Sequence, residues 1–230
     1  MKRFYKNVTV DETGDGFRFL LDGKPVQTPA RQPLLLPTRA LAEAIAEEWR
    51  AQGDEMLPLA MPLTRLVNAV LDGVRATRAD VIAAILRFGE NDLLSYRAEA
   101  PVALVARQLD WNIYLDWAAE RHGARLAVTS GIRHVEQSAE TLAALRLAVS
   151  GLSDFHLAAL HVLASVTGSL VLGLAVLDGR LTADEAFALS RLDESYQAER
   201  WGIDREAEQR AGRLAAEMGH AAQLVSLSRA

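Results

Sequence analysis

Residues 155–177 read FHLAALHVLASVTGSLVLGLAVL and contain no Asp, Glu, Lys or Arg. An uncharged run of this length can cross a bilayer. However, two histidines and three hydroxyl side chains interrupt it, and no cluster of basic residues flanks it. The segments on either side are strongly amphipathic. The run therefore predicts a central helix over residues 153–177 that neighbouring helices bury on all sides, and no membrane insertion.

Helix start and stop signals surround this central run. Thr182 with Glu185 has the spacing of a capping box, and Asp204 is a good N-cap for a final helix. Glycines at 89, 123 and 202 are the expected helix stops. The predicted helices of this part of the chain cover residues 77–88, 101–121, 138–149, 153–177, 182–201 and 204–218.

The first third of the chain has a different pattern. Apolar and polar residues alternate over 4–10 and 17–21, and Asp22-Gly23 is a strong hairpin signal before a third strand over 24–28. A helix over 38–52 should follow, with Trp49 packed against the sheet, and then a short helix over 63–71. We expect an α+β protein, with an N-terminal mixed α/β domain of antiparallel strands plus helix at 1–75 and a larger all-helical domain at 76–230.

Composition excludes several classes of function. The 230 residues carry a net charge of −5, which argues against binding nucleic acid. No cysteine is present, so disulfides, thiolate metal sites and thiol nucleophiles are excluded. The histidines have no partner at ligand spacing, and no nucleotide loop or nucleophile elbow occurs. We therefore predict no catalytic, cofactor-binding or metal-binding residues, and no cofactor. The first residues lack a signal peptide, which predicts a complete cytoplasmic protein; a monomer is the simplest expectation.

The tract LDESYQAERWGIDREA at 192–207 holds the candidate site. Glu194, Gln197 and Trp201 have helical spacing of i, i+3 and i+7 and so share one face. The structural alternative is that Trp201 is a core residue, Asp204 only a cap, and Glu206 a partner of the helix dipole. An enzyme or small-ligand protein is a further alternative, with Glu194 or Glu206 as general acid or base in a cleft.

Several separated patches of sequence, in a fixed order along the chain, together resemble one family. They are Phe4-Tyr5-Lys6, Leu21-Asp22-Gly23-Lys24, Thr28-Pro29, Leu36-Pro37-Thr38, Leu41-Ala42, Glu48-Trp49, Gln52, Met61-Pro62-Leu63-Thr64, Asp92, Tyr96-Arg97, Gln108, Trp111, Asp193-Glu194, Tyr196-Gln197, Trp201-Gly202, Asp204 and Glu206-Ala207. The set resembles the assembly chaperones that bind the alpha subunit of the F1-ATPase.

The resemblance implies a chaperone with no enzyme activity. Such a protein would hold the free alpha subunit of ATP synthase and shield the apolar surface that later meets the beta subunit, since exposed surfaces of this kind aggregate. The match to the family's C-terminal motif makes five residues the candidates for partner binding: Glu194, Gln197, Trp201, Asp204 and Glu206. The family is best known from mitochondria, and this chain resembles a bacterial relative working in the cytoplasm.

Overall fold

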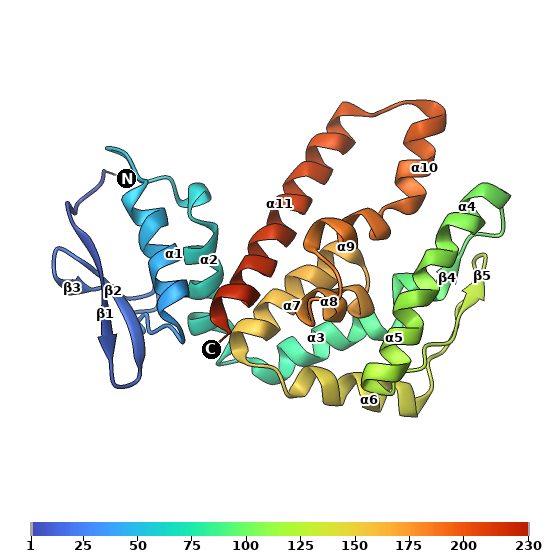
Figure 1. Ribbon diagram of the computed structural model, residues 1–230, viewed down its shortest axis with the longest axis horizontal. Coiled ribbons are helices and arrows are strands. Elements are labelled where there is room, and N and C mark those ends of the chain that lie inside the picture. Colours follow the sequence, from blue (N-terminus) through green and yellow to red (C-terminus); the bar gives the residue numbers. More distant parts are fainter. Residues whose placement is uncertain (1, 230) are drawn as a thin grey trace. The chain divides into compact units, whose positions relative to one another are not determined.

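The computed structural model describes residues 2–229, which form two compact units (Figure 1). Unit 1 holds the chain up to Arg78, together with Ser153–Ala159 and the C-terminal residues from Gln223. Unit 2 holds Ala79–Leu152 and Leu160–Ala222. The predicted α+β class is confirmed, with a small antiparallel sheet near the N-terminus and helices in the rest of the chain. The division into domains at residue 75 stays a prediction.

Three antiparallel strands form the sheet of unit 1 in the order β1 (Val8–Thr13), β2 (Gly16–Leu21) and β3 (Lys24–Pro25). Asp22 and Gly23 connect β2 to β3, and both have positive φ angles, 48° and 80°. This is the conformation that a two-residue hairpin turn requires. The predicted first strand at 4–10 was placed too early, because the ladder with β2 begins only at Val8, opposite Leu21, and continues to Thr13, opposite Gly16.

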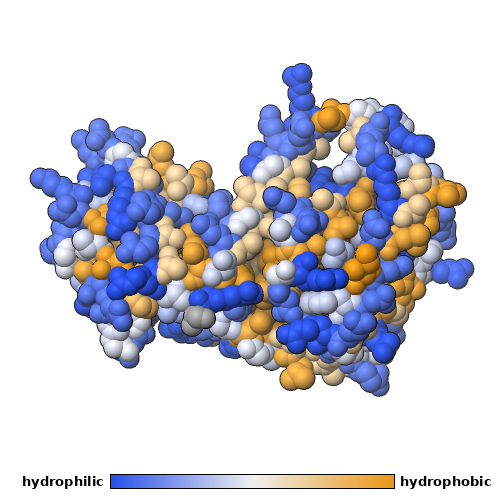
Figure 2. All heavy atoms as spheres, in the orientation of Figure 1, coloured by the Kyte–Doolittle hydropathy of each residue, from blue (hydrophilic) through white to orange (hydrophobic). Residues whose placement is uncertain are grey.

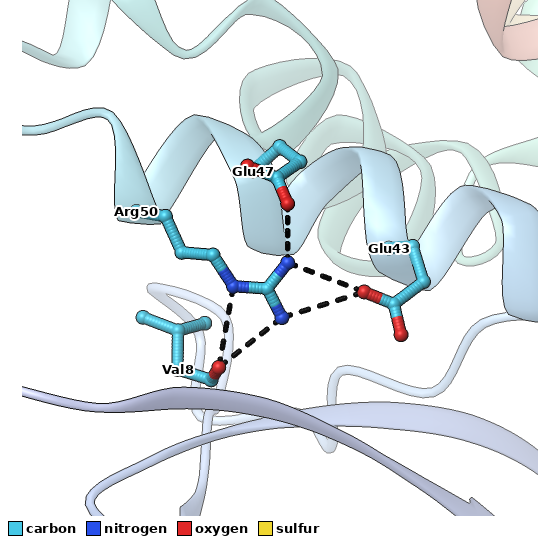
Figure 3. Close-up of polar contacts among 4 residues, drawn as sticks. All are labelled: Val8, Glu43, Glu47 and Arg50. Atoms are coloured by element: carbon cyan, nitrogen blue, oxygen red, sulfur yellow. Dashed lines mark hydrogen bonds and ion pairs between the residues drawn. The ribbon is translucent and has the colours of Figure 1, made fainter.

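Helix α1 (Arg39–Arg50) packs against β1 and β2. Thr38 caps its start by accepting a hydrogen bond from the Leu41 amide at 3.1 Å, as predicted. The Trp49 ring lies 5.4 Å from the Phe19 ring on β2, which confirms its packing against the sheet. Arg50 joins the helix to β1: its guanidinium donates to the Val8 carbonyl and pairs with Glu43 and Glu47 (Figure 3).

The chain then turns through a 3-10 segment at Pro58–Ala60 into α2 (Pro62–Ala69), which continues as a π-helical turn at Val70–Val74. The Glu48 carboxylate accepts hydrogen bonds from the Leu63 and Thr64 amides at 2.7 and 2.8 Å. These amides lie at the start of α2, where backbone donors have no partner within the helix. Glu48 therefore fastens α2 to α1.

The remaining chain forms helices and one short strand pair, joined by loops. Its helices are α3 (Arg78–Glu90), α4 (Val102–Gln108), α5 (Asn112–His122), α6 (Ala139–Ser150), α7 (Asp154–Thr167), α8 (Leu170–Leu177), α9 (Ala183–Ser190), α10 (Leu192–Trp201) and α11 (Arg205–Ser228). The longest loop runs between α5 and α6. Short 3-10 turns lie at Leu93–Ser95 and Leu109–Trp111. The parallel pair β4 (Tyr96–Arg97) and β5 (Thr129–Ser130) departs from the all-helical prediction.

The prediction of one helix over 153–177 was wrong. Gly168 takes a left-handed conformation with φ of 66° and separates α7 from α8. Ser169 then caps α8 by accepting from the Leu172 amide at 3.0 Å. All eight residues of α8 are buried, as the uncharged run predicted. Among residues 2–229, no helix combines the length and apolar character needed to cross a membrane.

Three other helix boundaries differ from expectation. Gly89 lies inside α3, which ends one residue later at Glu90. A Cβ there would stand 2.7 Å from a Leu145 methyl carbon, so the glycine permits close packing instead of ending the helix. The predicted helix over 182–201 breaks at Arg191 into α9 and α10. Helix α11 continues past Met218 to Ser228, since Ala221 and Leu224 are fully buried and extend its packed face.

Candidate functional site

Helices α10 and α11 follow one another in the chain within unit 2 (Figure 1). Helix α10 and the first turns of α11 enclose an open groove of about 650 Å³ (Figure 2). The groove brings together four of the five residues predicted for partner binding. Its lining comprises Arg191, Glu194, Ser195, Gln197, Ala198, Glu199, Trp201, Gly202, Ile203, Asp204, Ala207, Glu208 and Ala211. The candidate face of α10 is therefore one wall of a concave surface.

The turn between the two helices exposes large apolar side chains. Gly202 ends α10 with φ of 93°, a conformation that favours glycine. Asp204 accepts a hydrogen bond from the Glu206 amide at 2.9 Å and so caps α11, as predicted. Trp201 is 78% exposed and Ile203 is 66% exposed. The core alternative for Trp201 is therefore wrong: this indole lies at the surface of the groove.

Contacts with α4 hold α10 in place from its other side. The buried Tyr196 ring lies beneath the guanidinium groups of Arg107 and Arg200, at 5.3 and 4.9 Å. Gln108 donates to the Asp193 carboxylate at 2.8 Å. Arg107 also makes a bidentate pair with Glu199, at 2.8 and 2.7 Å. These contacts leave the face with Glu194, Gln197 and Trp201 directed toward the groove.

The groove is acidic. Its lining contains the four carboxylates of Glu194, Glu199, Asp204 and Glu208, against the single guanidinium of Arg191. Arg191 pairs with Glu194 at 3.3 Å. The hydrogen bond from Arg107 lowers the pKa of the Glu199 carboxyl group. Within residues 2–229, Asp204 and Glu208 form no ion pair, so no cation of the described chain balances these two groove-lining carboxylates.

Glu206 lies outside this groove, although it belongs to the same sequence tract. Its carboxylate pairs with Arg210 one turn further along α11, at 3.5 Å, and both side chains are largely exposed. The structure thus separates Glu206 from Glu194, Gln197, Trp201 and Asp204. Its part in partner binding stays a prediction. In the described part of the chain, no three His, Asp or Glu side chains converge as metal ligands.

Sequence reasoning missed Ile203 and Glu208. Ile203 has a local signal, because a large apolar residue between Gly202 and Asp204 is unusual in a polar turn. Glu208 lies four residues after Asp204 and so shares its face of α11. Arg107, by contrast, has no local signal, since its partner Glu199 is 92 residues away.

Trp111 and Asp92, two residues from the middle of the chain that belong to the patches resembling the family, have structural roles. Trp111 is 1% exposed, and its indole N–H donates to the Leu189 carbonyl at 3.0 Å. Asp92 is fully buried and accepts hydrogen bonds from the Leu94 and Val171 amides, both at 3.0 Å. Burial raises the pKa of the Asp92 carboxyl group to about 6, against the opposing effect of these hydrogen bonds.

Comparisons with known proteins match between about half of the chain and 99% of it. The model of the ATP12 chaperone protein family matches residues 2–119. Protein atp12, mitochondrial, of Schizosaccharomyces pombe is 26% identical over 215 residues, which are 87% of this chain and 74% of that protein. The crystal structure of Atp12 from Paracoccus denitrificans is 46% identical with a TM-score of 0.96, covering 99% of this chain and 98% of that chain. An aspartate-to-lysine mutant of the Paracoccus protein has the same identity and TM-score.

Proposed function

Because the chain belongs to the ATP12 chaperone protein family, we propose that it is an assembly chaperone for the F1 sector of ATP synthase. In this proposal it binds the free alpha subunit and shields the surface that later faces the beta subunit. It acts without a cofactor, as a cytoplasmic monomer. Family membership supports the chaperone role, and the groove on α10 and α11 supports the site.

The single observation that carries the site is the pair of exposed apolar side chains in a concave, carboxylate-rimmed surface. Trp201 and Ile203 present apolar area to solvent with no neighbour to cover it in the free protein. Concave apolar surfaces with a few polar groups are typical of binding sites, and tryptophan is enriched among residues that dominate interface energy. A client that covers this surface would in turn have its own apolar surface covered.

The candidate residues then have distinct roles. Trp201 supplies apolar contact, while Glu194 and Asp204 supply charge on the two walls of the groove. Gln197 offers an amide that can donate to and accept from client backbone. Glu206 lies at the outer edge of the site, where a larger client could reach it. The affinity need only protect the alpha subunit until the beta subunit displaces the chaperone by mass action.

A pull-down tests this function. The protein is expressed with the alpha and beta subunits of its host's ATP synthase and is eluted without detergent. We expect alpha alone to be recovered, and added beta to displace it. A Trp201→Ala variant should recover much less alpha, whereas Glu217→Lys, which changes an exposed residue of α11 outside the groove, should recover as much as the wild type.

Recovery of beta alone, or of neither subunit, would contradict the proposal. A small molecule that copurifies with the protein and is lost in Glu194→Gln would favour the alternative of a ligand-binding protein with an acidic site. The two functions therefore differ in what the same purification yields.

A further inference from the structure

The walls of the groove have an apolar part and a charged part, and the apolar part lies between the two helices. Ala198, Ala207 and Ala211 are small and leave the space between the helices unfilled. Trp201 and Ile203 border that space with large apolar side chains. A large apolar side chain of the client can therefore enter between the helices. Its own apolar surface and that of Trp201 and Ile203 would then be removed from water.

The charges of the groove are not balanced within the protein. Arg191 and Arg107 each pair with one glutamate, which leaves Asp204 and Glu208 without a cation among residues 2–229. Both lie at the start of α11, on the side that faces the groove. A neutral or acidic client would cover the Glu208 carboxylate without a cation, at a cost in desolvation, whereas Asp204 would keep only its hydrogen bond from the Glu206 amide. A basic client would pair with them.

We propose that the groove takes a basic amphipathic segment of the client, with an apolar side chain against Trp201 and Ile203 and lysine or arginine side chains against Asp204 and Glu208. This inference rests on the proposed function for the identity of the client and adds the chemistry of the segment that is bound. Complementary charge fixes the orientation of the segment and raises its association rate. The indole face of Trp201 can also contact a client cation.

Peptide binding tests the chemistry of this segment apart from the client. Two synthetic amphipathic peptides of equal length share the same leucine positions, and one carries lysine and the other glutamate at every polar position. The readout is the fluorescence of Trp201, which is 78% exposed. The Trp201→Phe variant gives the emission of the other three tryptophans, which is subtracted. We expect the lysine peptide to shift the Trp201 emission to shorter wavelength and to bind at least tenfold more tightly than the glutamate peptide.

Charge variants locate the contact. Glu208→Lys should weaken binding of the lysine peptide about tenfold, which corresponds to about 1.4 kcal/mol, and Glu208→Gln should weaken it less in the same direction. Glu217→Lys makes the same change of charge on the same helix outside the groove. It should leave affinity within about twofold, because it lies about 13 Å further along the helix axis, beyond the screening length of physiological salt. Thermal melts of each variant establish that it is folded. Equal affinity for both peptides, or equal effects of Glu208→Lys and Glu217→Lys, would overturn the inference.

The result separates this inference from the proposed function. If the alpha subunit is recovered in the pull-down but the lysine peptide does not bind, the basic-segment inference is wrong while the chaperone proposal stands. If the lysine peptide binds through Glu208 but no subunit is recovered, the chemistry of the groove stands and the identification of the client is wrong.

Discussion

Asp92 is the residue for which pH has the clearest consequence. Its carboxyl group is fully buried, and burial raises its pKa from 3.8 to about 6 in the folded protein. A raised pKa means that the folded state binds the proton more tightly than the unfolded state. The contribution of this group to stability is therefore complete below pH 3.8 and is lost as the pH rises through about 6.

The Asp92→Asn variant tests this dependence. The difference in the free energy of unfolding between the wild type and the variant should change by about 2.4 kcal/mol between pH 4 and pH 7, which is most of the effect of a shift from 3.8 to about 6 at about 1.4 kcal/mol per pKa unit. Denaturant unfolding at a series of pH values measures it. A pH-independent difference would show that Asp92 does not titrate in this range.

Glu194 and Glu206 differ in position, and charge reversal should show this. Glu194 lines the groove beside Arg191, whereas Glu206 pairs with Arg210 outside it. We expect Glu194→Lys to weaken recovery of the client at least fivefold, and Glu206→Lys to have a smaller effect. Both melting temperatures should fall by no more than about 2 °C, because exposed ion pairs contribute little to stability. A large loss of stability in Glu194→Lys would indicate a structural residue instead of a binding one.

Trp49 should show the opposite behaviour. Its ring packs against Phe19 and Tyr5, and its indole N–H donates to Thr64 at 3.2 Å. We expect Trp49→Ala to lower the free energy of unfolding by about 3 kcal/mol. This is the low end of the cost of truncating a buried aromatic side chain, because Trp49 is only half-buried. A Trp49→Arg change should destabilise further by placing a charge in this packed face. Client recovery by the protein that remains folded should be unchanged, which the pull-down measures.

At the scale of elements, the break between α7 and α8 depends on one backbone conformation. Gly168 has φ of 66°, which a residue with a Cβ adopts only at a cost of about 1–2 kcal/mol. Gly168→Ala should therefore destabilise the protein by about that amount in denaturant unfolding. Gly212→Ala is the matched control, since Gly212 lies within α11 and an added Cβ there would meet no other atom within 4 Å. In the helix interior the same substitution should stabilise by up to about 1 kcal/mol, so the two effects should have opposite signs.

The hairpin of α10 and α11 shows how an element acquires its orientation. The caps at Gly202 and Asp204 determine where the two helices end and begin. They do not determine which face of α10 is exposed. Contacts of Tyr196 with Arg107 and of Asp193 with Gln108 decide that, by holding the other face against α4.

At the scale of the whole molecule, the C-terminus of the chain belongs to the unit formed by its beginning. The residues from Gln223 are part of unit 1, and the Thr38 hydroxyl donates to the Leu227 carbonyl. Leu224 is fully buried, whereas the neighbouring Gln223 and Ser226 are exposed. We expect Leu224→Ala to cost about 2–5 kcal/mol and to increase hydrogen exchange in α1. Gln223→Ala and Ser226→Ala should leave exchange in α1 unchanged; equal effects of all three would contradict this placement.

The sequence by itself determined the features that depend on near neighbours. Thr38, Thr182 and Asp204 cap helices where their spacing predicted, because a cap requires only the next three residues. The hairpin at Asp22-Gly23 likewise follows from the turn alone. The common face of Glu194, Gln197 and Trp201 follows from helical periodicity, and the ordered patches of sequence were sufficient to identify the family.

The tertiary structure alone decided what depends on distant partners. Asp92 reaches Val171 across 79 residues, and Arg107 reaches Glu199 across 92, so neither pairing leaves a local signal. The break at Gly168 is hidden in sequence because α7 and α8 are both uncharged there, and only packing shows that one glycine turns the chain. The separation of Glu206 from the groove also depends on packing, because α10 covers a different face of α11 from the one that carries Glu206. Helical spacing gives the faces of one helix, but the neighbouring helices decide which face remains open to a partner.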